Sequence, residues 1–359
     1  MALVPVLTVT SLDRVLRDTT AAGLLCDLPG AVVLSHDLTV DGTLTRVVYD
    51  RDGTRDHQTL TLDHGCLSCA LREDVLPTLH HLISDRPAPP TAVILALPVT
   101  AEALPLVRAV QPLTGDSPVP GAAMAAVLAA VDTTTLVTDL LGDDQLIDRG
   151  LHLSESDRRS VGEALAQILE YADLVVTPHP SPTLAAGLLA HLVGPTITRR
   201  DLFALDPVPL LSVRRRPDDP RGDLRQVTAT GAADTDRLWS LDLHSWRPFH
   251  PDRLHRGLEQ LGAGPIRGRG VFWLPTRPHQ VGAWDGAGGQ LSIGAIGTWS
   301  GAQRHTHLVI TGLDHDPALV RTAFEHTLLT EAELGRGLDW WATRKDNFDP
   351  WFGEGRLSA

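Results

Sequence analysis

Two of the three cysteines in this sequence stand close together. Cys66 and Cys69 occur in the stretch HGCLSCALRED, residues 64 to 74. Two thiols three residues apart at a turn can bind one metal ion, and Zn²⁺ favours thiolate and imidazole ligands in a tetrahedral arrangement. Two more ligands are needed, and His64 is the nearest candidate, with His36 and His57 as contributions from neighbouring segments. The spacing therefore predicts a weak zinc site formed by Cys66, Cys69 and His64.

Two other interpretations of the cysteine pair stay open. CxxC is the spacing of thiol–disulfide exchange, and a helix N-terminus lowers the pKa of a thiol, which makes a thiol-disulfide oxidoreductase an alternative. No other part of the chain is similar to a thioredoxin-like unit. The third interpretation is that two small residues pack in a tight loop. Three cysteines in all cannot form a disulfide framework, so their number fits a reducing compartment.

The segment that follows the cysteines has the pattern of a helix. If this helix begins near Glu73 or Asp74, Pro77 falls in its first turn, where the missing amide costs no hydrogen bond. The two carboxylates then lie at the positive end of the helix dipole. We interpret them as helix caps rather than catalytic groups, because no nucleophile or second carboxylate pair accompanies them.

Length and charge limit the possible functions. A chain of 359 residues is too long for one ordinary core, which predicts two domains. The net charge of −13 disfavours direct nucleic-acid binding, and the clusters at 158–159, 199–200 and 214–216 are interpreted as solvated surface arginines. There is no basic leader before the first apolar run, and no apolar stretch reaches the roughly 20 residues that span a bilayer. We expect a cytoplasmic protein without a membrane partner.

The first two hundred residues alternate between strand and helix patterns. This alternation predicts βαβ units and a mostly parallel sheet covered on both faces, in a domain of residues 1–213. The strands are predicted at Val4–Val9, Ala31–Leu34, Arg46–Tyr49, Thr59–Leu62, Ala92–Leu97, Ala125–Val131, Leu174–Thr177 and Pro209–Val213. Residues 214–237, rich at their start in Arg, Asp and Pro, are predicted to be a linker.

A smaller α+β domain is predicted for residues 238–335. Its pattern has several antiparallel strands and two helices, without the regular alternation of the first domain. Trp246, Phe249, Phe272, Trp273 and Trp284 are expected to form its core. Two of its histidines, at 305 and 307, would place both rings on one face of a strand, as a metal pair requires. The tail, 336–359, holds three of the eight tryptophans and is expected to pack back onto a domain, with a docking patch as the alternative.

The first domain lacks the sequence of a phosphate-binding loop. Such a loop follows the first strand with the pattern GxxxxGK[ST], in which backbone amides wrap the phosphates and a lysine neutralises them. Here the first strand continues as TSLDRVLRDTTAAG, with no glycine before Gly23, and the whole chain contains one lysine, Lys345 in the tail. A guanine-reading Asn-Lys-x-Asp motif is absent too, since YADLVV is followed by TPHP. GTP hydrolysis is therefore predicted to be weak or absent, because phosphoryl transfer depends on groups that hold and neutralise the phosphates.

Over nearly its whole length the chain resembles CobW-like proteins. The carrying motifs are GCLSCALREDVLPTL, AAVDTTTLVTDLLGDDQL and EYADLVV in the first domain, and RPFHPDRL, GVFWLPTRP and WDGAGGQLSI in the second. The resemblance implies an α/β domain like the P-loop NTPases of the CobW/HypB/UreG class, followed by a smaller α+β CobW C-terminal domain. Ser68 stands where the family has the central cysteine of its G-C-x-C-C motif, and a hydroxyl is a hard, weak donor beside thiolates.

The departures from the family pattern resemble one branch of it. A GC-x-SC motif without a phosphate loop is similar to proteins that recruit a ribosome hibernation factor to the ribosome during zinc starvation. What this resemblance implies is a zinc-linked adaptor that lacks GTPase motifs, with the hibernation factor and the small ribosomal subunit as partners, zinc as a possible weak ligand and GTP binding unlikely. The first alternative is a zinc metallochaperone GTPase of the CobW family, and the second is the CxxC thiol-disulfide oxidoreductase.

Overall fold

The chain divides into two compact units. The computed structural model describes residues 3–84, 88–193, 197–262, 264–299 and 304–353, so residues 354–359 of the predicted tail lie outside the described part. One unit comprises Met1–Asp139, Asp144–Ala186 and Pro195–Gly222, and the other comprises Leu140–Asp143, Gly187–Gly194 and Asp223–Ala359. The division after Gly222 lies within residues 214–237.

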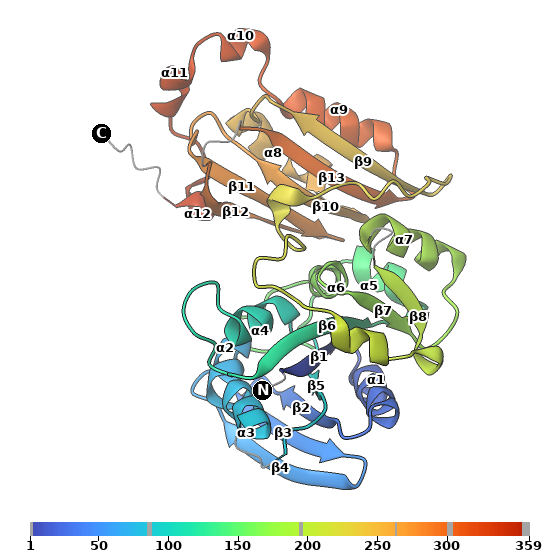
Figure 1. The fold of residues 1–359 in the computed structure, drawn as a ribbon. Helices are drawn as coiled ribbons and strands as arrows, with labels where there is room; N and C mark the ends of the chain where they lie inside the picture. Colours follow the sequence, from blue (N-terminus) through green and yellow to red (C-terminus); the bar gives the residue numbers. More distant parts are fainter. Residues whose placement is uncertain (1–2, 85–87, 194–196, 263, 300–303, 354–359) are drawn as a thin grey trace. The chain divides into compact units, whose positions relative to one another are not determined.

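An eight-stranded sheet forms the centre of the first unit (Figure 1). Its strand order is β4-β3-β2-β5-β1-β6-β7-β8. The strands are β1 (Val4–Ser11), β2 (Val32–Leu38), β3 (Thr43–Asp50), β4 (Gly53–Thr61), β5 (Val93–Ala96), β6 (Ala122–Ala130), β7 (Leu174–Thr177) and β8 (Thr198–Asp201). From β2 to β8 all neighbours are parallel, which confirms the mostly parallel sheet.

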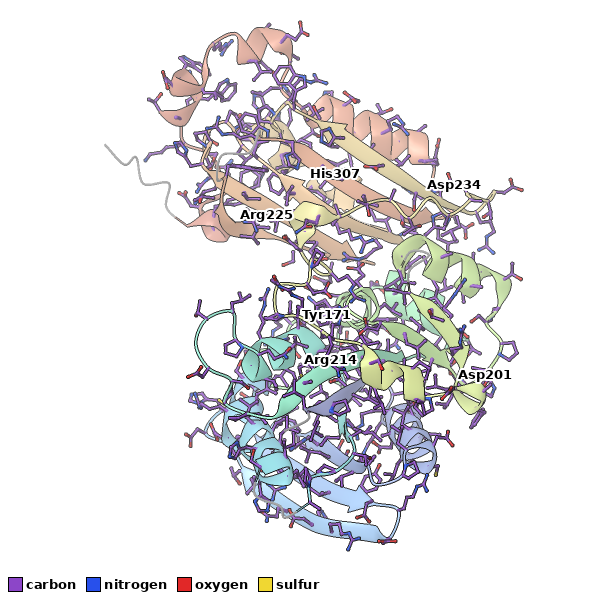
Figure 2. All side chains as sticks on the ribbon, viewed as in Figure 1. Tyr171, Asp201, Arg214, Arg225, Asp234 and His307 are labelled. Atoms are coloured by element: carbon purple, nitrogen blue, oxygen red, sulfur yellow. The ribbon has the colours of Figure 1, made fainter. Side chains whose placement is uncertain are left out.

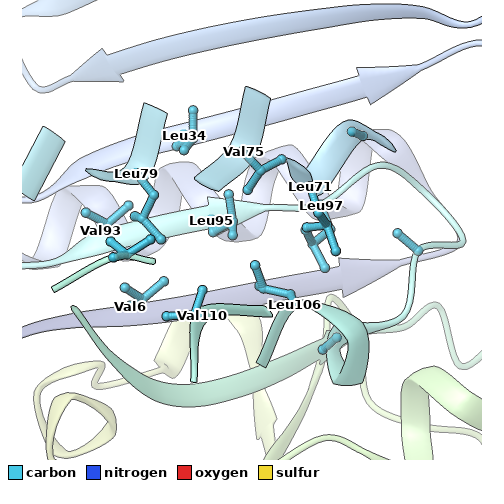
Figure 3. Close-up of a cluster of buried hydrophobic side chains, with 14 of the residues drawn as sticks. Val6, Leu34, Leu71, Val75, Leu79, Val93, Leu95, Leu97, Leu106 and Val110 are labelled. Carbon is cyan, nitrogen blue, oxygen red and sulfur yellow. The ribbon is translucent and has the colours of Figure 1, made fainter. Parts of the chain in front are cut away.

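Helices cover both faces of this sheet, as expected for parallel strands. On one face, α1 (Arg14–Asp27) packs Leu24 and Leu25 into a cluster with Leu7 and Ile94. The cluster on the opposite face includes side chains of α3 (Leu76–Ser84) and α4 (Ala103–Val110), which lie against strand residues such as Leu95 (Figure 3). The remaining helices of the alternating pattern are α5 (Leu136–Leu141), α6 (Val161–Glu170) and α7 (Thr183–Val193).

Three parts of the sheet differ from the sequence-based expectation. Strands β3 and β4 form an antiparallel hairpin beside β2 and do not join the parallel set. The strand predicted at Pro209–Val213 is wrong: Val208–Ser212 is a 3₁₀ helix, η3, and a proline there cannot donate to a strand ladder. Strand β8 has the sequence TRRD with four exposed residues, and it carries no apolar pattern by which it could be predicted.

The interpretation of 214–216 as solvated arginines is wrong for Arg215. This side chain is 2% exposed and its guanidinium lies 4.1 Å from the centroid of the Tyr171 ring, a residue labelled in Figure 2. It also pairs with Asp173 at 3.2 Å and with Asp219 at 2.5 Å. The segment after η3 is therefore fixed to the first unit by a buried cation between two carboxylates.

The second unit contains a five-stranded antiparallel sheet with the order β12-β11-β10-β13-β9. Its strands are β9 (Leu238–Ser245), β10 (Ile266–Phe272), β11 (Gln280–Ala287), β12 (Gln290–Thr298) and β13 (Thr306–Leu313). Helices α8 (Pro251–Gly262) and α9 (Pro317–Thr327) contribute Leu254 and Phe324 to the core. Four of the five aromatic residues expected in this core are buried, but Trp246 is 63% exposed, because it follows the end of β9.

The tail packs back onto the second unit. After α10 (Glu331–Leu334), the described part of the tail forms α11 (Leu338–Ala342) and α12 (Asp349–Phe352). Phe348 and Phe352 belong to the same core cluster as the sheet, and Arg277 binds Asp346 at 2.8 Å. This confirms the expectation that the tail is not a free segment. In the described part of the chain, no helix combines the length and the hydropathy of a membrane span.

Candidate functional site

The turn between β1 and α1 is the place where a nucleotide-binding domain of this topology would hold phosphate. Leu12 and Asp13 alone separate the end of β1 at Ser11 from the start of α1 at Arg14. Asp13 caps the helix: its Oδ1 accepts a hydrogen bond of 2.8 Å from the amide of Leu16, and its own amide donates to Ser11 Oγ at 3.0 Å. A helix N-terminus attracts anions through such amides, and here a carboxylate of the chain itself already occupies this position.

Apolar side chains fill the space next to this turn. Leu12 and Leu151 pack against a cluster of Leu146, Val161 and Ala164. The segment that carries Leu151 is held in place by Thr100, whose Oγ1 donates to the carbonyl of Leu151 at 3.1 Å. The carboxyl end of β1 therefore faces leucine and alanine side chains rather than glycine amides.

Arg17 is a residue of this region that the sequence did not single out. It is 0% exposed, and its Nη1 donates to the carbonyls of His36 and Leu97 at 3.0 and 2.9 Å. Its Nη2 binds Asp37 at 2.9 Å. Arg17 thus joins α1 to the carboxyl ends of β2 and β5. Its charge is satisfied inside the protein, so it does not serve as a substitute for a phosphate-binding lysine.

Cys66 and Cys69 lie together at the start of a helix. Cys66 is the N-cap of α2 (Leu67–Ala70), and its Sγ accepts a hydrogen bond of 3.4 Å from the amide of Cys69. Cys69 is 7% exposed and packs in the core cluster beneath the helix, whereas Cys66 is half-buried. The structure therefore brings the two predicted thiols to one helix end, with Cys66 the more accessible of the two.

The helix after the cysteines begins earlier than the sequence predicts. Helix α2 continues into a π-helical turn, η1 (Leu71–Val75), and then into α3, so Pro77 lies inside a helical stretch and not in a first turn. The Leu76 amide bonds to the carbonyl of Leu71, five residues back. A wider turn directly before Pro77 relieves the clash that a proline ring makes with the preceding turn of an α-helix.

The interpretation of Glu73 and Asp74 as helix caps is also wrong. Asp74 is 2% exposed and accepts a hydrogen bond from His36 Nε2 at 2.7 Å, while Arg46 binds its other oxygen at 2.5 Å. Glu73 binds Arg72 at 2.8 Å. Asp74 therefore fastens the helix to β2 and β3, and it engages His36, one of the histidines considered as a metal ligand.

A cleft of about 260 Å³ opens beside Cys66. It is lined by Cys66, Leu67, Ser68, Ala101, Glu102, Pro105, Leu153, Ser154, Asp157 and Arg159. Thr100, at the edge of the cleft's wall, is fully buried and has a φ of 65°. A β-branched residue in this left-handed region costs about 1–2 kcal/mol. Three hydrogen bonds hold Thr100 there: its amide donates to the carbonyl of Ser11, its hydroxyl donates to the carbonyl of Leu151, and its carbonyl accepts from the guanidinium of Arg159.

The charged wall of the cleft opposite the cysteine loop is built around Arg159. Its guanidinium donates to both oxygens of Asp157 at 2.9 Å and to Glu102 at 3.1 Å. Burial is the largest single influence and would raise the pKa of Asp157, but the hydrogen bonds and charge of Arg159 and two backbone hydrogen bonds together outweigh it, so the pKa is lowered. The interpretation of Arg159 as a solvated surface residue is therefore wrong, whereas its neighbour Arg158 is exposed.

The other predicted ligands lie as follows. His64 is exposed on the loop before Cys66, and its carbonyl accepts a hydrogen bond of 2.8 Å from the Cys66 amide. His57 is exposed on β4. Across the described ranges of the chain, no group of three or more His, Cys, Asp or Glu side chains is arranged to hold a metal ion. The two thiols fit a zinc ion chemically, and the remaining ligands would have to be recruited when the ion binds.

Cys66 affects the ionisation of the Cys69 thiol. The hydrogen bond with Cys66 is the largest cause that raises the pKa of the Cys69 thiol, and burial and the charge of Cys66 act in the same direction. Arg72, whose Nη2 lies 3.7 Å from Cys69 Sγ, opposes the shift. Cys69 is therefore protonated at neutral pH in the absence of metal, which disfavours spontaneous thiolate chemistry.

Comparisons with known proteins match both units. Residues 32–178 match the CobW/HypB/UreG nucleotide-binding domain, and residues 238–328 match the cobalamin synthesis protein cobW C-terminal domain. The first match begins at Val32, so β1 and α1, which flank the missing phosphate loop, lie outside it.

Two curated relatives are similar over most of their length. The zinc chaperone Rv0106 of Mycobacterium tuberculosis (strain ATCC 25618 / H37Rv) is 28% identical, over 92% of this chain and 89% of its own. The zinc-regulated GTPase metalloprotein activator 1 of Dictyostelium discoideum is 22% identical, over 79% and 68%. Among solved structures, the Zn(II)-bound YjiA GTPase from E. coli is 15% identical, with a TM-score of 0.39 over 91% of this chain and 99% of that one. This chain carries a domain of the CobW/HypB/UreG nucleotide-binding family followed by a CobW C-terminal domain.

Proposed function

We propose that this protein binds zinc through Cys66 and Cys69 and passes it on, or reports its presence, without hydrolysing a nucleotide. The contact between Cys66 Sγ and the Cys69 amide carries this proposal, because it places both cysteines at one helix end, where Cys66 lines a cleft. Thiolates are preferred ligands of Zn²⁺. The similarity to proteins named zinc chaperone and zinc-regulated metalloprotein activator supports the same choice of metal.

The ligand set favours a zinc carrier over a structural zinc site. Structural zinc is usually enclosed by four protein ligands, while functional sites keep a position open. Here two sulfurs come from the chain, and His64 on the adjoining exposed loop is the best third ligand. A site with an open position can accept a ligand from a receiving protein, which allows the ion to transfer between the two.

The turn at Asp13 supports the part of the proposal that concerns nucleotide. A two-residue connection capped by a carboxylate offers neither the amides nor the cation that triphosphate binding uses. We therefore propose that zinc binding in this protein is not coupled to GTP. In this respect it differs from the relative that is named a zinc-regulated GTPase.

Zinc titration in competition with a chromogenic chelator tests the zinc site. The protein is prepared without a histidine tag, and the double variant Cys66→Ser/Cys69→Ser is compared with Cys26→Ser, which removes the exposed third thiol. We expect one stoichiometric site in wild type and in Cys26→Ser, weakened by at least about 100-fold in the double variant. Equal affinity in all three proteins would disprove the assignment of zinc to this pair.

A second candidate function is that of an adaptor. Without a phosphate loop, the first unit would act by binding other proteins instead of by hydrolysing a nucleotide. The resemblance to the branch without a phosphate loop suggests a ribosome hibernation factor and the small ribosomal subunit as partners. Affinity purification of the full chain from zinc-depleted and zinc-replete cells distinguishes the candidates. Recovery of that factor with ribosomal subunits upon depletion favours the adaptor, and recovery of zinc-dependent enzymes favours the carrier.

A further inference from the structure

Three basic residues of the tail carry charge that no carboxylate of the described chain neutralises. Arg336, Arg344 and Lys345 are exposed, and they flank α11, the tail helix that follows α10 (Figure 1). Across the described ranges, none of the three forms an ion pair, not even with Asp339, which lies between them in sequence. The protein as a whole has a net charge of −13. A concentration of free positive charge in one short segment is therefore a local exception.

The indole of Trp340 holds two of these cations. The guanidinium carbon of Arg344 lies 3.6 Å from the ring centroid, and that of Arg336 lies 4.7 Å from it. Stacking on an aromatic ring fixes the plane of a guanidinium but leaves the N–H donors in that plane available for hydrogen bonds. Because both groups share one ring, they are closer than the Debye length of about 10 Å at 0.1 M salt and repel each other. An anion bound between them would relieve this repulsion.

The backbone that carries these cations is fixed on both sides. Before α11, Arg253 binds Glu333 at 2.7 Å, and Trp341 is buried with its Nε1 donating to the carbonyl of Glu333 at 3.0 Å. After α11, Arg277 binds Asp346 at 2.8 Å. These contacts hold the segment in place, and they engage two carboxylates that could otherwise neutralise the free cations. The positive charge is thus preorganised for an anion from outside the described chain.

We propose that Arg336, Arg344 and Lys345 bind an acidic segment of a partner protein, in which two or more Asp or Glu side chains lie close together. Guanidinium groups bind carboxylates through paired hydrogen bonds, and Arg and Trp are the residues that contribute most to protein interfaces. This surface belongs to the second unit and goes beyond the zinc function proposed for the cysteine pair.

A nucleic acid fits this surface less well than an acidic segment. Arg344 already covers a face of the Trp340 ring, on which a base would have to stack. A long polyanion is also repelled by the net charge of the protein, whereas a short acidic segment carries its charge only where it meets the three cations.

Fluorescence polarisation of the full chain with a fluorescein-labelled hexaglutamate peptide tests the proposal. At low ionic strength we expect saturable binding, weakened about three- to fivefold by Arg336→Gln or by Arg344→Gln. The double variant should lose at least about tenfold, because hydrogen bonds between charged groups are lost at both positions. Arg321→Gln, at an exposed arginine of α9, removes the same charge elsewhere on the second unit and should leave the affinity unchanged.

A further variant separates an oriented site from general attraction between charges. Trp340→Ala keeps all three cations but removes the ring that orients two of them, and it should weaken binding about two- to fivefold. The Cys66→Ser/Cys69→Ser protein should bind the peptide as wild type does, so this test does not depend on the zinc site. Circular dichroism and the melting temperature of each variant show whether it is folded.

Four results would overturn the proposal. They are the failure of wild type to bind hexaglutamate, an equal loss in Arg321→Gln and Arg336→Gln, and unchanged binding by a folded Trp340→Ala protein. The fourth is tighter binding of a labelled oligo(dT) strand through Arg336 and Arg344, which would make the partner a nucleic acid. The single arginine variants change exposed side chains only, so they give a reading even if Trp340→Ala does not fold.

Discussion

Asp13 Oδ1 accepts a hydrogen bond of 2.8 Å from the amide of Leu16, at the helix end where a phosphate would bind in a domain of this topology. Removing this cap should destabilise the first unit. We expect Asp13→Ala to cost about 0.5–2 kcal/mol, measured by calorimetric unfolding. Asp27→Ala, at the other end of the same helix, is the control and should cost nothing, because a carboxylate there opposes the helix dipole. An equally stable Asp13→Ala protein would show that the cap contributes little.

Ser68 lines the same cleft as Cys66 and stands between the two thiols in sequence. Ser68→Cys should strengthen zinc binding by about tenfold or more, because a thiolate replaces a weak hydroxyl donor. Chelator competition measures the change. Ser84→Cys, an exposed thiol at the end of α3, is the matched control and should have no effect. If both variants bind zinc as wild type does, Ser68 does not face the ion.

Zinc binding at the cysteine pair should weaken as the pH falls. The pKa of Cys69 is raised, chiefly by its hydrogen bond with Cys66, so this thiol carries a proton at neutral pH that zinc must displace. Affinity is then greatest above the raised pKa and declines steadily as protons compete below it. Titrations between pH 6.5 and 8.5, in roughly half-unit steps, measure the slope. A pH-independent affinity in this range would contradict the protonated state assigned to Cys69.

Arg215 is the buried cation between Asp173 and Asp219. Arg215→Ala removes the buried partner of two half-buried carboxylates, and breaking a buried ion pair costs about 3–5 kcal/mol. Arg221 still binds both aspartates, so we expect the lower end of this range. The measurement is the melting transition of the first unit. Arg216→Ala is the control, since its side chain is 76% exposed, and a similar loss in both variants would argue against a role for burial.

Apolar runs were sufficient to predict most strands of the first sheet, but they predicted neither β8 nor the ionic contacts. The strand Leu174–Thr177 was predicted with the limits it has, because a buried apolar run between Asp173 and Pro178 is unambiguous. The meeting of Cys66 and Cys69 followed from their spacing at a helix start. Arg17 and Arg215 could not be identified, because a charged residue is buried only when partners distant in sequence neutralise it.

The helix after the cysteines shows a second limit of prediction from the sequence. Pro77 marked a helix start under the rule that proline belongs in a first turn, but the π-helical turn at Leu71–Val75 lets the helix begin ten residues earlier than that proline, at Leu67. Such a turn has no sequence signature of its own. Likewise, the sequence shows two histidines at 244 and 307, but it does not show that they lie opposite each other, which depends on the pairing of β9 with β13.

The most direct test of the central claim is the zinc affinity of the untagged protein, measured with and without millimolar GTP and Mg²⁺. Zinc binding through Cys66 and Cys69 without nucleotide coupling predicts the same affinity in both conditions, with no GTP retained on the protein. A change of about tenfold or more, which corresponds to about 1.4 kcal/mol of coupling free energy, would contradict it.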